Sequence, residues 1–291
     1  MRRIIVNADD FGYNTGVNAG VVEAARAGAL TSTTLMAPSA AFDDAVRRAS
    51  EVPRLGVGCH VCLVGTRPVS PPEAIPSLVG RDGRFLPSLG AFARRCFGGG
   101  LREDEMRREV EAQVEKVIRA GHPPTHLDAH KHVFVLARVH RVLCGVCRRY
   151  AIPAMRNPYD ADPFRLRARA GNPRAYTRQW LLGRLVRVTR RGFSRRCAEA
   201  GLRTPDRFFG VAATGLWSPA YLDGVFAELA DGVNELMVHP AVMDESMRKS
   251  RSRLRESRGV ELRLLLERVP GLAASRGVAL TDYSIFAKKE S

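Results

Sequence analysis

The chain has 291 residues, of which 45% are hydrophobic, and a formal net charge of +16 at pH 7. Its length fits a single α/β barrel, and it contains no apolar run of the roughly 18 residues that a transmembrane helix needs, so no such helix is expected. The apolar stretch after Met1 is too short for a signal peptide, and we expect a cytoplasmic protein.

The first predicted element is a short buried strand that includes Ile4, Ile5 and Val6. Asp9 and Asp10 follow at its end, and Gly12 suits a sharp exit into a helix that begins near Thr15. Two adjacent carboxylates at the mouth of a buried strand are costly unless a cation lies beside them. The stretch therefore predicts a metal site.

Strands and helices alternate along the rest of the chain. Further strands are predicted over 31–36, 55–64, 125–135, 153–156, 208–212, 234–238 and 278–282, and helices over 17–27, 41–50, 103–120, 137–150, 175–200, 218–231 and 257–268. This alternation predicts a distorted, TIM-like (β/α)7–8 barrel, with a doubly wound open sheet as the alternative. We expect one domain over 1–291, with a long functional loop at 65–102 and a basic helical insertion at about 164–203.

The six cysteines are not spaced like a disulfide framework. Two Cys-x-x-Cys pairs, Cys59 with Cys62 and Cys144 with Cys147, raise the possibility of a structural zinc ion, but neither pair has the Gly or Pro of a zinc ribbon. Buried free thiols are the preferred interpretation.

The segment 126–132 has the most specific local pattern. His126, Asp128, His130 and His132 alternate with other residues, so on a strand they share one face. Four titratable groups on one face are hard to explain as core, and the pattern predicts a site.

Asp10, His60 and His130 are the candidate ligands of one divalent ion, because three protein ligands of this kind leave positions for water and substrate. Gly58 is expected to leave room beside His60. The mixed nitrogen and oxygen ligands suit zinc or magnesium, and they do not decide which of the two metals is bound. Asp9 is then free to act as the general base on water activated by the ion.

Three further predictions complete the site. Arg156 is expected to hold Asp9 ionised through a bidentate pair, with a surface ion pair as the alternative, and His239 to protonate a leaving amine. The candidate substrate contacts are Asp128, His132 and Tyr159.

Four motifs now establish a resemblance. Asn-Ala-Asp-Asp-Phe-Gly at 7–12, Gly-x-His at 58–60, Thr-His-Leu-Asp-Ala-His-Lys-His at 125–132 and Met-Val-His-Pro at 237–240 resemble the YdjC-like carbohydrate deacetylases, which include chitooligosaccharide and hopanoid-biosynthesis deacetylases. The resemblance implies a barrel of the polysaccharide-deacetylase type and metal-dependent removal of acetyl from an N-acetylated sugar. It also implies ligation by Asp10, His60 and His130, with Asp9 as base and His239 as acid.

The segment 164–203 bears on the substrate, since it contains twelve Arg and one acid. Its predicted helix has Leu181, Leu182, Leu185, Val186 and Val188 on one side and arginines mainly on the other, which is typical of a helix on an anionic membrane surface. The alternative is an ordinary outer helix with a solvated Arg face. Because 67–76 and 204–210 resemble the hopanoid branch, we expect a lipid-linked N-acetylglucosamine substrate and peripheral contact with the inner membrane face.

Three alternatives stay open. One is a soluble chitooligosaccharide deacetylase, and a second keeps the metal but hydrolyses a phosphoester, a reaction that usually needs more carboxylates. The third, a basic nucleic-acid-binding protein, explains the charge but not the His/Asp strand, so no nucleic-acid partner is expected.

Overall fold

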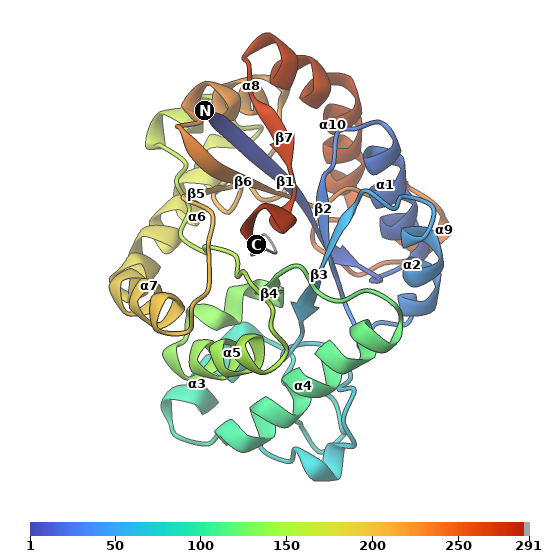
Figure 1. Cartoon of the computed structure of the whole chain (residues 1–291), viewed down its shortest axis with the longest axis vertical. Helices are drawn as coiled ribbons and strands as arrows, with labels where there is room; N and C mark the ends of the chain where they lie inside the picture. Colours follow the sequence, from blue (N-terminus) through green and yellow to red (C-terminus); the bar gives the residue numbers. More distant parts are fainter. Residues whose placement is uncertain (288–291) are drawn as a thin grey trace.

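The computed structural model describes residues 1–287, and the described strands form one parallel sheet (Figure 1). Its order is β4-β3-β2-β1-β6-β5, and β7 pairs with β1 beside this path. The strands are β1 (Arg2–Phe11), β2 (Ser32–Leu35), β3 (Gly56–Val61), β4 (Leu127–Ala129), β5 (Arg207–Phe209), β6 (Gly232–Val238) and β7 (Ala279–Thr281).

The sheet curls until its two edges meet through an irregular segment. Leu127 in β4 forms a parallel bridge with Met155, and Phe208 in β5 forms one with Asp160. The segment 155–160 therefore lies between the two edge strands, although it forms no regular strand where one was predicted at 153–156. The predicted distorted β/α barrel is confirmed, and the open doubly wound sheet is wrong.

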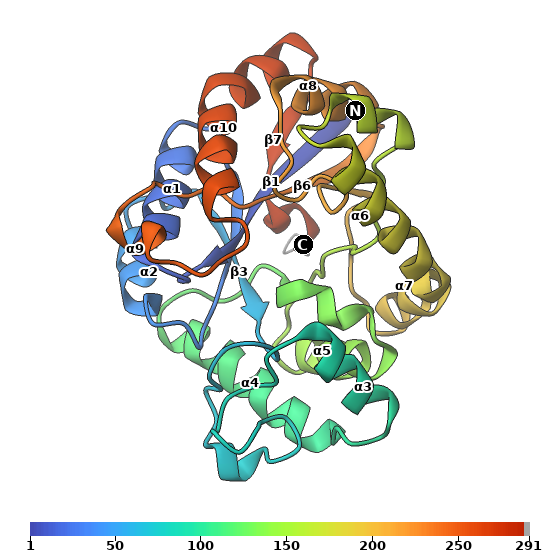
Figure 2. The same ribbon diagram turned by 180° about the vertical axis from the view of Figure 1, so that it is seen from behind.

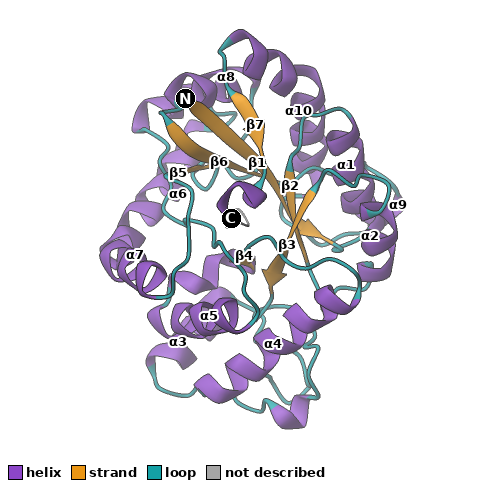
Figure 3. Cartoon of the chain, viewed as in Figure 1, coloured by secondary structure: helices purple, strands orange, loops and turns teal. Residues whose placement is uncertain are grey.

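Helices surround the strands, as Figure 2 and Figure 3 show. They are α1 (Thr15–Arg26), α2 (Phe42–Ala49), α3 (Leu89–Phe97), α4 (Glu103–Arg119), α5 (Ala137–Arg149), α6 (Pro173–Val186), α7 (Arg190–Glu199), α8 (Pro219–Glu228), α9 (Glu245–Arg248) and α10 (Arg255–Ser275). Three departures from expectation occur. The helix α3 lies inside the predicted loop 65–102, α9 lies where no helix was predicted, and the predicted helix 175–200 is divided at Arg187–Thr189 by a short 3-10 turn.

The end of the described chain fills the interior of the barrel. After β7, a 3-10 turn over Tyr283–Phe286 lies among the strands in both views of the ribbon (Figures 1 and 2). The Tyr283 ring stacks on His126 with 3.5 Å between centroids and 5° between planes. The sequence suggested that Gly58 leaves room beside His60. In the structure the His126 ring takes this space instead.

Replacing Gly58 with alanine is expected to lower the free energy of unfolding by about 1–3 kcal/mol, the usual cost of overpacking a core. A Cβ atom there would lie 2.4 Å from the His126 ring and 2.8 Å from a backbone oxygen. Urea denaturation measures the effect. Gly145→Ala is the matched control, because a Cβ at that helical glycine has no neighbour within 4 Å, and it should be neutral or stabilising. Equal effects of both substitutions would contradict this packing.

The strand β4 is shorter than predicted. It ends at Ala129, and a turn over His130–Val135 follows in which Lys131 and His132 have φ of 54° and 52°. The backbone leaves strand geometry here, so the alternation predicted for 125–135 stops after His130. His132 consequently leaves the strand face.

Candidate metal and catalytic site

An irregularity in β1 turns two consecutive carboxylates towards the barrel mouth. The pairing of β1 with β2 shifts register between Ala8 and Phe11, and Asp10 has φ of 67°. In a regular strand Asp9 and Asp10 would point to opposite faces. The bulge instead brings both into contact with the same group of polar residues, and aspartate tolerates the left-handed backbone better than most residues do.

Asp10, His60 and His130 converge at the carboxyl ends of β1, β3 and β4. Oδ1 of Asp10 lies 3.2 Å from Nδ1 of His130 and 3.5 Å from Nε2 of His60, and one donor atom from each residue lies within 4.8 Å of the other two. Asp10 and His60 are buried, whereas the His130 side chain is 22% exposed. Two imidazoles and one carboxylate open to solvent on one side fit a zinc-class or magnesium-class ion with space for substrate.

Asp9, His60 and Asp128 form a second set of donors of similar size. This set is less suited to a metal, because both carboxylates already bind the Arg156 guanidinium. His60 also uses Nδ1 for Asp128, at 2.7 Å, which leaves Nε2 to face Asp10. The geometry favours the Asp10 set.

Asp128 lies behind the His60 ring, on the side of Nδ1. It is completely buried, and its oxygens contact His60, Arg156 and the Thr34 hydroxyl. Burial lowers the pKa of His60, but Asp128 and the neighbouring aspartates outweigh it and raise that pKa to about 9. The structure therefore gives Asp128 the position of a residue that orients His60, in place of the predicted substrate contact.

Arg156 is completely buried and holds three carboxylates, so the alternative of a surface ion pair is wrong. Its Nη1 and Nη2 donate to the two oxygens of Asp9 at 2.8 and 2.6 Å, Nη1 also lies 2.6 Å from Asp128, and Nε donates to Glu235 at 2.8 Å. Burial alone would raise the pKa of Asp9, but the guanidinium holds it below its usual value. Burial raises the pKa of Glu235 to about 7.

Sequence reasoning missed Arg258, which lies in α10 and is 2% exposed. Its Nη2 donates to Oδ2 of Asp10. Burial alone would raise the pKa of Asp10, but the positive charge of Arg258 helps to hold that pKa well below its usual value. The available signal was its place on the apolar stripe of α10, since Leu262, Leu265 and Val269 follow at helical spacing and are buried.

His239 follows β6 at the same mouth and is paired with a second missed residue, Glu261 of α10. Oε2 of Glu261 accepts the His239 backbone N–H at 2.6 Å and lies 3.8 Å from Nδ1 of the ring. Burial lowers the pKa of His239 to about 4 and raises that of Glu261 to about 7. Burial therefore favours the neutral form of the ring and the protonated form of the carboxyl group next to it.

Neither His132 nor Tyr159, the other two predicted substrate contacts, has a hydrogen bond or ion pair with the ligand set among the described residues. His60 and Asp9 nevertheless lie close enough to His132 to affect its pKa. The His132 ring meets Phe208 edge-on at 5.9 Å, and burial lowers its pKa to about 3. Tyr159 is buried, its ring packs edge-on against Phe193 in α7, and its hydroxyl lies 2.7 Å from Thr189. Tyr159 thus anchors the basic insertion to the barrel.

Comparison with known proteins shows which family this chain belongs to. Residues 3–269 match the model of the YdjC-like protein family. A carbohydrate deacetylase of Geobacillus stearothermophilus is 33% identical over 291 residues, which cover 99% of each chain. A chitooligosaccharide deacetylase of Klebsiella pneumoniae (strain 342) is 31% identical over 249 residues, 84% of each chain.

Among solved structures, a candidate cellobiose-phosphate cleavage protein from Enterococcus faecalis V583 has a TM-score of 0.77 and 26% sequence identity, with 99% of each chain covered. Both the fold and the full-length sequence matches agree with the resemblance drawn from the motifs. The chain therefore belongs to the YdjC-like family of carbohydrate deacetylases.

Proposed function

We propose that this protein removes the acetyl group from an N-acetylglucosamine-type sugar, with one divalent ion held by Asp10, His60 and His130. The observation that carries the proposal is the separation of two neighbouring carboxylates into different environments. Asp10 faces the two histidines, whereas Asp9 is held ionised by Arg156. A ligand and a base are thereby available side by side, as hydrolysis of an amide requires.

A bound divalent ion supplies a Lewis acid for the acetyl carbonyl and makes a nearby water easier to deprotonate. Asp9 accepts a proton from the attacking water, whose oxygen bonds to the carbonyl carbon. Arg156 keeps Asp9 in the ionised, oriented form that this step needs. The C–N bond then breaks and the nitrogen leaves with a proton, giving acetate and a free amine.

His239 donates that proton through the ring nitrogen that does not face Glu261. Because a neutral imidazole has one proton to give, the ring needs another from Glu261, and the 3.8 Å between Oε2 and Nδ1 must close to hydrogen-bond distance for that transfer. Arg258 acts on the other side of the site, where it fixes Asp10. Asp128 fixes His60.

Acetate release from N-acetylated glucosamine oligomers tests the reaction. We expect release that a chelator abolishes and a divalent ion restores. Release of phosphate from sugar phosphates, with no acetate from any N-acetylated sugar, would replace this proposal by phosphoester hydrolysis. Activity that is indifferent to chelation after exhaustive dialysis would contradict the role of the ion.

We further propose that the substrate is linked to a lipid and that α6 contacts an anionic membrane. Leu181, Leu182 and Leu185 of α6 and Val188 of the 3-10 turn that follows are 53–86% exposed. Trp180 and Val186 pack against the core, so only part of the apolar stripe is free of the barrel. Arginines flank the exposed stripe, and 164–203 contains a single acid. Among residues 1–287 no helix is long and apolar enough to cross a bilayer, and the proposed contact is peripheral.

Replacing Leu181 and Leu185 together with aspartate is expected to weaken binding to anionic vesicles by about 100-fold, since each buried leucine contributes about 1.5 kcal/mol or more. Sedimentation with vesicles at low salt measures this. Leu89→Asp is the matched control, because Leu89 is exposed on α3, away from this helix. Wild-type protein that does not distinguish anionic from neutral vesicles would rule out the membrane contact.

The hopanoid assignment is tested separately with free and lipid-linked N-acetylglucosamine. The proposal predicts a higher kcat/KM for acetate release from the lipid-linked sugar. A preference for free oligosaccharides would assign the chain to the chitooligosaccharide branch instead.

A further inference from the structure

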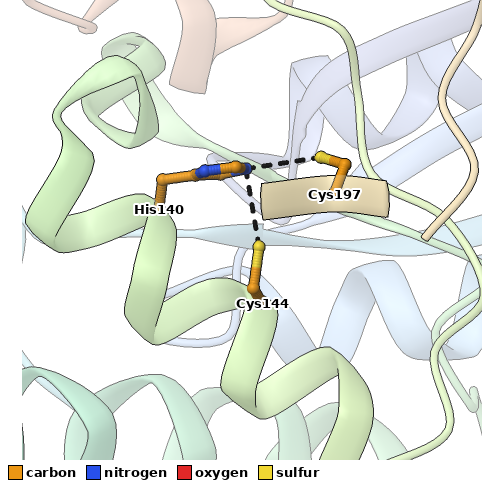
Figure 4. Close-up of side chains that lie close together, drawn as sticks. All are labelled: His140, Cys144 and Cys197. Atoms are coloured by element: carbon orange, nitrogen blue, oxygen red, sulfur yellow. Dashed lines mark hydrogen bonds between the residues drawn. The ribbon is translucent and has the colours of Figure 1, made fainter. Parts of the chain in front are cut away.

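A second group of potential metal ligands lies outside the barrel mouth, between helices α5 and α7. His140 and Cys144 come from α5 and Cys197 from α7, and Figure 4 shows the two thiols pointing at the same ring nitrogen. Nε2 of His140 lies 3.6 Å from Sγ of Cys144 and 3.5 Å from Sγ of Cys197. All three side chains are buried, and the three donor atoms lie within 4.8 Å of one another.

These separations fit a tetrahedral ion. Bonds of about 2.3 Å to sulfur and about 2.0–2.1 Å to nitrogen at the tetrahedral angle put the two donors about 3.5–3.6 Å apart. The two nitrogen–sulfur distances have these values. The ordinary hydrogen bond between an imidazole and a thiol has a similar length, so the chemistry of the sulfurs has to decide.

That chemistry favours a cation. Two buried thiols, one from α5 and one from α7, converge on a single imidazole nitrogen, and neither is joined in a disulfide. The thiolate is the form that binds metals. One imidazole with two cysteines is a ligand set that zinc uses in proteins, with a fourth position left for water.

We propose that His140, Cys144 and Cys197 form a second metal site, which takes a zinc-class ion. The site joins the basic insertion to the barrel. Phe193 of α7 stacks on the His140 ring at 4.0 Å, so the ion would fasten α7 onto α5 at a contact that is already packed. The inference does not depend on the proposed deacetylation.

Arg196 is the competitor of the ion. Its Nε donates to Nδ1 of His140 at 2.8 Å, which places the ring proton on Nε2, the atom that would bind metal. Binding therefore requires that proton to move to Nδ1 and the half-buried Arg196 side chain to turn away. Arg196→Leu removes both the competing hydrogen bond and a nearby positive charge, and should tighten binding about tenfold.

Cobalt titration of the full-length, metal-free and fully reduced protein tests the proposal. Cobalt bound to thiolates absorbs strongly in the near ultraviolet. Cobalt bound to two histidines and an aspartate lacks this absorption band. We expect this band in the wild-type protein and in Asp10→Ala, and bleaching of the band by added zinc. Metal analysis should show one zinc less per chain in Cys144→Ser/Cys197→Ser than in the wild type.

Cys147→Ser is the matched control, since Cys147 is a buried cysteine of the same helix outside the three-donor set. A folded, reduced wild-type protein with no thiolate band at saturating cobalt would overturn the site, and this result needs no variant. A band that survives the double serine substitution, or one that is lost equally in Cys147→Ser, would overturn it as well.

Discussion

Asp9→Asn is expected to lose about 10²–10⁴-fold in kcat while the protein keeps its metal, because asparagine cannot accept the proton of the attacking water. Asparagine has the size of aspartate and retains one oxygen that can accept a hydrogen bond from Arg156. In the wild-type protein Arg156 binds both oxygens of Asp9. The acetate-release assay measures kcat, and metal analysis of the same preparation measures retention of the ion.

Asp223→Asn is the matched control, since Asp223 pairs with Arg268 away from the barrel mouth and should keep wild-type activity. Asp10→Asn should behave differently from Asp9→Asn, with weakened metal binding as well as lost activity. If Asp9→Asn lost its metal and Asp10→Asn kept it, the roles assigned to the two carboxylates would have to be exchanged.

Arg156→Met is expected to lower the free energy of unfolding by about 3–5 kcal/mol at neutral pH, the usual cost of removing one partner of a buried ion pair. The substitution leaves Asp9, Asp128 and Glu235 buried without their shared cation. Urea denaturation measures the loss. Arg268→Met is the control, because the Arg268–Asp223 pair is half-exposed, and its effect should be much smaller.

The loss caused by Arg156→Met should shrink in acid. The folded-state pKa of Asp9 lies below that of the unfolded chain, so its pair with Arg156 contributes stability above about pH 4 and loses it as the pH falls further. Without Arg156, the buried carboxyl groups take up protons more readily and cost less at low pH. A destabilisation that stayed constant or grew towards low pH would contradict the proposed ion-pair network.

The fold and the family could both be predicted from local signals, the alternation of strands and helices for the fold and four short motifs for the family. Apolar strands alternating with amphipathic helices indicated the barrel. Asp10, His60 and His130 lie at or next to the carboxyl ends of β1, β3 and β4, and the carboxyl ends of parallel strands meet at one edge of the sheet. Convergence of the three side chains was therefore a consequence of topology that a strand pattern could anticipate.

Backbone irregularities could not be anticipated in the same way. The positive φ of Asp10 places both aspartates at one mouth, and those of Lys131 and His132 end β4 early, yet none of these residues is a glycine that would have indicated a turn. The strand predicted to run to Val135 was accordingly too long.

Side chains contributed by distant helices were harder to predict. Arg258 shares the buried stripe of α10 with Leu262 and Leu265, but nothing in the sequence indicates that its partner is Asp10, and the same holds for Glu261 and His239. Cys144 and Cys197 belong to helices joined by a long insertion, so spacing alone pointed to the Cys144–Cys147 pair and not to the cluster that the fold assembles.

Anomalous diffraction at the absorption edge of a bound metal tests the central claim most directly. Crystals grown with zinc should show an anomalous peak at the barrel mouth within bonding distance of Asp10, His60 and His130, whatever else the crystal binds. A peak at the mouth that lay instead between Asp9 and Asp128, or a fully loaded and active enzyme with no peak there, would contradict the account.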